Sequence, residues 1–167
     1  SWDGRLDRIS LRIGAGEIVG LGGLDGQGQK SLLLALFGVL RGVSGRVTVE
    51  DREVRAGSPA AAKSVGIALV PEDRKTEGLM LPMSIADNLA IASLDAISTG
   101  PFVDRAKESA AVKRAIARLQ IKIGAPGDPV STLSGGNQQK VVLAKWLMTE
   151  PRIILLNDPT RGIDVGT

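Results

Sequence analysis

The chain has 167 residues, of which 43% are hydrophobic and 23% charged, a composition typical of a one-domain globular protein that buries roughly 70% of the surface of its unfolded chain. It contains no cysteine and no histidine, which excludes disulfides, Cys/His zinc sites and a Ser-His-Asp triad from this chain. The formal net charge of +3 is small and dispersed, and it therefore argues against a dedicated surface for DNA or RNA.

The first part of the chain predicts two strands, a glycine-rich loop and a helix. Residues 11–13 alternate like a half-exposed strand, and residues 17–22 have the pattern of a buried strand that leads into the loop. Residues 30–40 then follow a strongly apolar helical pattern. Their uninterrupted apolar run is far shorter than the roughly 18 residues that a membrane-spanning helix requires, so no span is expected.

The next part predicts a short hairpin, a short helix and a buried strand. Residues 46–50 and the residues after Asp51 have the pattern of the hairpin, and residues 66–70 that of the strand. Ser58 is expected to cap a helix over residues 58–64, because Pro59 suits the first helical position. The polar residues 71–78 predict a loop at a strand's carboxyl end, where open α/β sheets bind ligands.

The remaining part predicts helices followed by a last buried strand at residues 153–156. Residues 84–123 read as helical, with an apolar face and a basic face that is expected to be solvated. Ser134-Gly135-Gly136 opens a further helix, whose bare N–H groups and dipole favour an anion. Strands and helices in this order predict an α/β fold with a largely parallel core sheet.

The glycine-rich loop is ambiguous when it is taken alone. A dinucleotide-binding fingerprint fails because Asp25 stands where its third glycine is required. A strict phosphate-binding loop also fails, since Gln29 holds the lysine position after Gly23 and Gly28, and Lys30 comes one residue late. The loop by itself fits a phosphate site and a tight structural turn equally well.

The motifs taken together resemble the nucleotide-binding domain of ABC transporters across essentially the whole chain. They are the glycine loop at residues 23–31, Leu-Ser-Gly-Gly-Asn-Gln at 133–138, and an Ile/Leu strand that ends in Asn-Asp-Pro-Thr at 157–160. The sequence of residues 133–147 and 159–166 is similar to that of the second cassette of the two-cassette ATPases of bacterial monosaccharide importers. The resemblance implies a P-loop NTPase fold over residues 1–167, cut at its C-terminal end, with a mostly parallel core sheet, an antiparallel β part and a helical insert at approximately 84–130.

The resemblance also implies a role for individual residues. Asp158 corresponds to the glutamate that orients the attacking water, and Glu72 lies in the Q-loop. Ser134, Gly135 and Gly136 match the signature motif, which caps the nucleotide held by a second cassette. Asn157 and Ser31 are the metal candidates, and Asp164 falls on the D-loop. The Walker A loop that would bind nucleotide comprises Gly23, Asp25, Gly26, Gln27, Gly28, Gln29, Lys30 and Ser31.

The departures from the family pattern predict a weakened nucleotide site in this cassette. Gln29 is neutral where the family has lysine, and Lys30 places a cation at the position of the magnesium-binding hydroxyl. Asn157 is the neutral counterpart of a metal-binding aspartate, and Asp158 is one methylene shorter than the expected glutamate. Mg²⁺ is therefore expected to be held weakly, while the intact Ser134-Gly135-Gly136 would complete the other cassette's site.

The expected cofactors are ATP and Mg²⁺, and the expected partners are a second cassette, membrane permease subunits and a substrate-binding protein, at the cytoplasmic face of a bacterial inner membrane. Residues 80–83 either dock a membrane subunit or are buried in the helical insert. Two other functions stay open: a cassette that binds nucleotide without hydrolysing it, and an ABC ATPase unconnected with transport.

Overall fold

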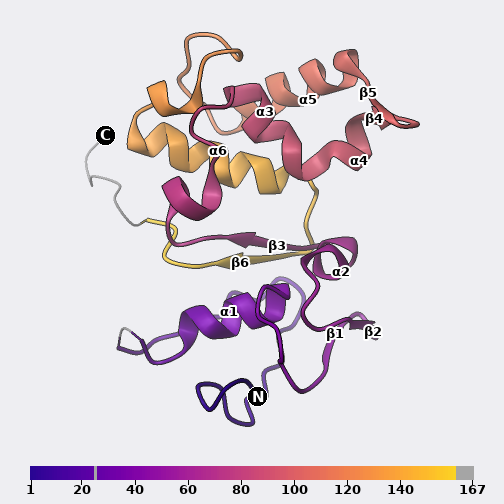
Figure 1. The fold of residues 1–167 in the computed structure, drawn as a ribbon, viewed down its shortest axis with the longest axis vertical. Coiled ribbons are helices and arrows are strands. Elements are labelled where there is room, and N and C mark those ends of the chain that lie inside the picture. Colours follow the sequence, from indigo (N-terminus) through magenta and orange to yellow (C-terminus); the bar gives the residue numbers. More distant parts are fainter. Residues whose placement is uncertain (25, 161–167) are drawn as a thin grey trace. The chain divides into compact units, whose positions relative to one another are not determined.

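The structure is a computed structural model that describes residues 1–24 and 26–160 (Figure 1). The chain divides into two compact units, Ser1–Ile67 and Ala68–Thr167. The first unit contains α1 (Gln29–Phe37), the antiparallel hairpin of β1 (Val47–Val49) and β2 (Arg52–Val54), and α2 (Pro59–Ser64). The predicted hairpin and both predicted helices of this part are therefore confirmed.

Local capping explains where these helices begin and end. The Ser58 hydroxyl accepts a hydrogen bond from the Ala61 amide at 3.2 Å, as the sequence predicts for an N-cap followed by proline. Helix α1 ends at Gly38, whose φ of 81° belongs to the left-handed region. The amides of Gly38 and Val39 bond back to Ala35 and Leu34, which is the Schellman arrangement, so α1 stops before the predicted Leu40.

The two strands predicted before the glycine loop are wrong. Residues 11–13 and 17–22 lie in irregular structure, and Ile18 is 98% exposed. The Glu17 carboxylate accepts a bond from the Gly14 amide at 2.7 Å, which closes a local turn. A buried strand also needs ladder partners, and in the described residues of this unit the ladder belongs to β1 and β2. Apolar residues alone did not make a strand here.

The second unit is built around a pair of strands that run in the same direction, β3 (Ile67–Val70) and β6 (Ile153–Leu156) (Figure 1). All four residues of β3 are buried, as predicted. The prediction that β6 is fully buried is wrong, since Ile154 and Leu156 are 40% and 47% exposed. Alternate residues of a strand point to opposite faces, and in β6 the face of Leu155 is the covered one.

Helices make up most of this unit, and their apolar faces form one core. The elements are η1 (Arg74–Gly78), α3 (Ile85–Ala90), η2 (Ile91–Ser93), α4 (Leu94–Ile97), β4 (Ser98–Thr99), β5 (Phe102–Val103), α5 (Arg105–Arg118), η3 (Val130–Thr132) and α6 (Gly135–Leu147). The buried cluster joins Val70 of β3 to residues of α3, α5 and α6. Among the described residues, no helix has the length and apolar character to cross a bilayer.

The predicted helical stretch 84–123 is interrupted by the hairpin of β4 and β5. Gly100 has a φ of 61° and Pro101 follows it, and both features are incompatible with a continuing helix. Beyond this hairpin α5 is helical as predicted, with Val112 buried among the core residues, but it ends at Arg118, before the predicted residue 123. Parallel pairing in the core and antiparallel hairpins outside it confirm the predicted α/β class.

Candidate functional site

The glycine loop of the first unit is folded around two of its own glutamine side chains. The Leu24 amide donates to Gln27 Oε1 at 3.1 Å, and Gln29 Nε2 donates to the Leu24 carbonyl at 3.3 Å. A Cβ on Gly23 would lie 2.1 Å from Gln29 Nε2, so a side chain at this position would displace the Gln29 amide. The neutral side-chain amides of Gln27 and Gln29 thus bond to the amide and the carbonyl of Leu24 in the loop backbone.

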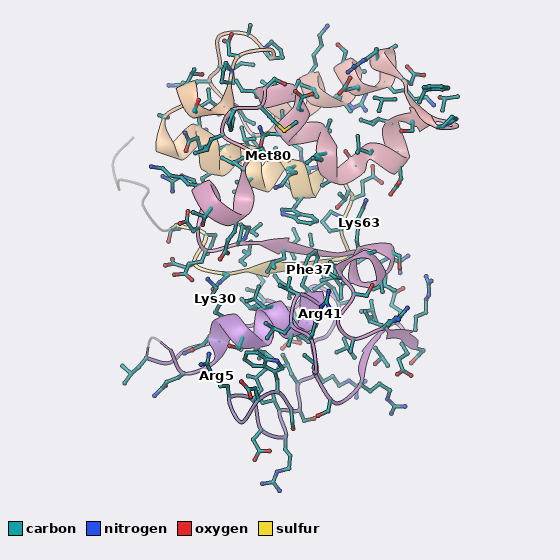
Figure 2. The ribbon with its side chains drawn as sticks, in the orientation of Figure 1. Arg5, Lys30, Phe37, Arg41, Lys63 and Met80 are labelled. Atoms are coloured by element: carbon teal, nitrogen blue, oxygen red, sulfur yellow. The ribbon has the colours of Figure 1, made fainter. Side chains whose placement is uncertain are left out.

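Helix α1 begins directly after this loop. Gly28 is its N-cap with a φ of 104°, and no side chain caps the helix. Gln29, Lys30 and Ser31 form its first turn, which contains no acidic residue, and Figure 2 shows Lys30 at this end of the helix. Amides without a capping side chain and a positive dipole end favour an anion.

A pocket of about 410 Å³ adjoins the start of α1. Its wall contains glycine backbone, both glutamines and one cationic side chain, that of Arg5 (Figure 2). The lining residues are Arg5, Leu6, Ile9, Gly20, Leu21, Gly22, Gln27, Gly28, Gln29 and Leu32. Polar donors beside an apolar wall suit a small polar ligand.

In the second unit, three predicted site residues lie where β3 and β6 end. The Asn157 amide donates to the Val70 carbonyl at 3.0 Å, which joins the carboxyl ends of the two strands. Glu72 follows β3, and Asp158, which is exposed and has a φ of 45°, follows β6. The parallel pairing therefore brings these polar residues to one edge of the sheet.

The turn after Glu72 is fixed by a carboxylate. Asp73 caps η1, and its Oδ1 accepts bonds from the amides of Lys75 at 2.8 Å and Thr76 at 3.4 Å. The bond from the Lys75 amide is the main reason that the pKa of Asp73 lies below its usual value. This cap sets the direction in which the chain leaves the sheet edge.

Ser134 is the N-cap of α6, as the sequence predicts for this motif. Its hydroxyl accepts bonds from the Asn137 amide at 3.4 Å and from Asn137 Nδ2 at 3.0 Å. Gly135 and Gly136 are the first two helical residues. A Cβ on Gly136 would meet no atom within 4 Å, so the packing of this chain does not require glycine there. The motif is an open, anion-accepting helix start.

Two residues that the sequence reasoning missed hold this helix start in place. Asn137 Oδ1 accepts a bond from the Lys122 amide at 2.9 Å. Gln138 is 6% exposed and donates from Nε2 to the Leu133 carbonyl at 3.0 Å. Their amide side chains, three and four residues after the cap, were a usable signal, because such residues face the preceding turn.

The two metal candidates predicted from the sequence are Ser31 and Asn157. Ser31 belongs to the first unit and Asn157 to the second, and neither carries a charge. In residues 1–24 and 26–160 there is no group of three Asp, Glu, His or Cys side chains that could hold a metal ion. Mg²⁺ prefers carboxylate oxygens. Two further predicted site residues, Asp25 and Asp164, lie outside the described residues.

Comparisons with known proteins agree with one another. The chain matches the family model of the ABC transporter over residues 6–161. It is 62% identical to the ribose import ATP-binding protein RbsA 1 of Mesorhizobium japonicum, in an alignment that covers 100% of this chain and 33% of that protein. It is 47% identical to the ribose import ATP-binding protein RbsA 2 of Streptomyces avermitilis, over 99% and 33% respectively. The chain thus spans about a third of the length of the curated relatives it matches.

Solved structures share the fold. A dimer of the ATP-binding cassette MJ0796 bound to ADP and Pi has a TM-score of 0.74 and 20% identity, covering 96% of this chain and 68% of that one. The structure of cbiO1 from Clostridium perfringens has a TM-score of 0.64 and 22% identity, covering 85% and 54%. The predicted fold of an ATP-binding cassette is confirmed.

Proposed function

This chain belongs to the ABC transporter family, and we propose from that membership that it is one ATP-binding cassette of a bacterial importer for ribose or a similar monosaccharide. Its ATPase would couple ATP binding and hydrolysis to uptake. The remaining two thirds of a protein as long as its relatives can contain a second cassette. Permease subunits and a substrate-binding protein would complete the assembly at the cytoplasmic face of the inner membrane.

The capped start of α6 carries this proposal. Ser134 and the two glycines present amides, and the side-chain space at Gly136 is open. That space suits a phosphate group approaching from a facing cassette. The solved cassette dimer bound to ADP and Pi has the same fold, which supports two facing cassettes here. The helical insert, at approximately 84–130, would bring the motif to the facing cassette.

This cassette's own site would bind nucleotide weakly and hydrolyse little. Gln29 cannot neutralise phosphate charge, and its amide already bonds the loop backbone. If Lys30 stood 4 Å from Mg²⁺, repulsion at an effective dielectric constant of 20 would amount to about 8 kcal/mol before screening. Asn157 adds no charge to offset it. Glu72 and Asp158 remain as the polar groups that could act on a γ-phosphate or a water.

One substitution tests the signature role in the complete polypeptide. Ser134→Arg would fill the open helix start with a long side chain, and we expect ATP turnover to fall at least a hundredfold. Ser131→Arg is the matched control, because Ser131 is also exposed and lies three residues earlier. Full turnover by Ser134→Arg would show that this motif is not shared with a second cassette.

The weak-site proposal has its own test. With the other cassette's nucleotide site inactivated, the unaltered protein should show little Mg-dependent hydrolysis. Gln29→Lys combined with Lys30→Ser should raise its affinity for ATP, measured by calorimetry with and without Mg²⁺. Hydrolysis at ordinary ATPase rates by the unaltered site would contradict the proposal. Tight nucleotide binding without hydrolysis would favour the second candidate, a non-hydrolysing cassette, which the neutral Gln29 contact supports.

A further inference from the structure

A buried lysine near the end of α6 has no part in the proposed function. Lys145 is 9% exposed, and its Nζ donates to the Gly78 carbonyl oxygen. Within the described residues this carbonyl is its one hydrogen-bond acceptor, and the ring of Trp146 lies 5.7 Å from the ammonium. An ammonium buried without a carboxylate is unfavourable, so packing alone would be better served by an apolar side chain.

The carbonyl that Lys145 binds ends η1, the turn that follows Glu72. A Cβ on Gly78 would lie 3.1 Å from Val142 Cγ2 on α6 and 3.4 Å from Pro71 Cγ. Glycine therefore lets η1 approach α6 closely, and the lysine fixes it there. The same helix carries Ser134 at its start, roughly 16 Å away along the axis.

The segment after Gly78, residues 78–84, is called the strap here. Asn88 of α3, which is 1% exposed, accepts a bond from the Met80 amide at 2.8 Å and donates to the carbonyls of Met80 at 3.0 Å and Ser84 at 2.9 Å. The Val130 amide donates to the Met83 carbonyl at 3.0 Å. The strap is thus fixed from α3, from the residues just before Ser134, and from α6.

The strap also presents an apolar surface. Met80 and Met83 are 38% and 37% exposed, although their backbone groups are bonded inward, and Figure 2 shows Met80 beside the helices of this unit. Burial of residues 80–83 in the helical insert, one of the two alternatives from the sequence, is therefore wrong for Met80, Pro82 and Met83, which are exposed. A displacement of the strap would be transmitted to the elements that hold its backbone, which are α3, α6 and the residues just before Ser134.

We propose that Lys145 is a positioning residue that locks the strap to α6, so that the strap and the Ser134-Gly135-Gly136 motif move as one body. This inference rests on the proposed function, because it concerns how the motif reaches the nucleotide of a facing cassette. Lys145 touches no reacting atom. It acts by keeping the segment that follows Glu72 in a fixed position against α6, the helix that carries the motif.

The test compares variants of the complete polypeptide assembled with its membrane subunits. Lys145→Met removes the donor and the charge, while Lys145→Arg keeps both. Lys140→Met is the matched control, since Lys140 lies on the same helix and also donates to a carbonyl, that of Gln120 at 3.2 Å, but does not touch the strap. The readouts are turnover, KM for ATP, and hydrogen exchange of the Met80 and Met83 amides.

We expect Lys145→Met to exchange both amides about tenfold faster and to lower turnover about tenfold, with KM for ATP changed less than twofold. Lys145→Arg should recover turnover to within threefold, and Lys140→Met should match the unaltered protein. Unchanged exchange in Lys145→Met would overturn the lock, and faster exchange with full turnover would overturn its coupling to the motif. If Lys145→Met fails to fold, Lys145→Gln, which keeps a neutral donor, is judged by the same two criteria.

Ser134→Arg in the same assay separates this inference from the proposed function. If Ser134→Arg leaves turnover intact, the shared motif is wrong, whatever the Lys145 variants show. If Ser134→Arg abolishes turnover while Lys145→Met leaves it intact, only the positioning role of Lys145 fails.

Discussion

The buried ammonium of Lys145 should make the stability of the fold depend on pH in a calculable direction. Burial lowers the pKa of Lys145 from 10.5 to about 8. Below pH 8 the folded and unfolded chains both hold the proton, so the folded state carries the full desolvation penalty. Between pH 8 and 10.5 the unfolded chain keeps the proton while the folded chain releases it. The contribution of Lys145 to the free energy of unfolding therefore rises across this window.

The size of the effect follows from the difference between the two pKa values. At about 1.4 kcal/mol for each pKa unit, the folded state should gain about 3 kcal/mol between pH 7 and pH 10.5. Above pH 10.5 both states have lost the Lys145 proton and the contribution is constant.

Urea unfolding at several pH values would measure this dependence. The free energy of unfolding of the unaltered protein, minus that of Lys145→Met, should rise by about 3 kcal/mol from pH 7 to pH 10.5. Lys140→Met is the matched control, because Lys140 lies on the same helix but donates to the Gln120 carbonyl and not to that of Gly78. Parallel curves for the unaltered protein and Lys145→Met would refute the reasoning, since they would mean that the folded state does not disfavour the charged lysine.

Three further substitutions, two of them paired with a comparison variant, test the fold by calorimetric or chemical unfolding. Gly38→Ala should destabilise by about 2 kcal/mol or more, because its Cβ would lie 2.7 Å from backbone atoms of Ser58 at a φ of 81°. Gly42→Ala, with a φ of 73° and open space around it, isolates the conformational strain and should cost about 1 kcal/mol; equal losses would contradict the close approach. Asn88→Ala should cost about 3 kcal/mol or more, because it removes a buried side chain, leaves the Met80 amide without its acceptor and takes one donor each from the carbonyls of Met80 and Ser84; a loss under about 1 kcal/mol would mean that water replaces the amide. Ser134→Ala should cost about 1 kcal/mol through loss of the α6 cap, and Ser134→Asp should recover it.

Features fixed by neighbouring residues were predictable from the sequence. Ser58 followed by Pro59 gave the start of α2, and Ser134 followed by glycines gave the start of α6, because a cap needs only its own next turn. The break at Gly100-Pro101 also has a local signal in the sequence, because a glycine followed by a proline disfavours a continuing helix.

Features that depend on distant partners were not predictable in the same way. Residues 17–22 have the composition of a buried strand, yet a strand exists only where another one pairs with it. In the candidate site, the side chains of Gln27 and Gln29 bond to the loop backbone. These bonds depend on the path of the loop, which no residue pattern specifies. Lys145 reads in the sequence as an ordinary helical lysine, and only the approach of η1 to α6 makes it a buried one.

The pairing of β3 with β6 has a consequence for how the chain folds. Residues 71–152 separate the two strands, so closing this pair early would confine a very long loop, whereas the helices between them form through local contacts. We therefore expect the helices to assemble first and β3 and β6 to pair late. Until it does, the wholly apolar β3 is an unprotected edge on which nascent chains can aggregate.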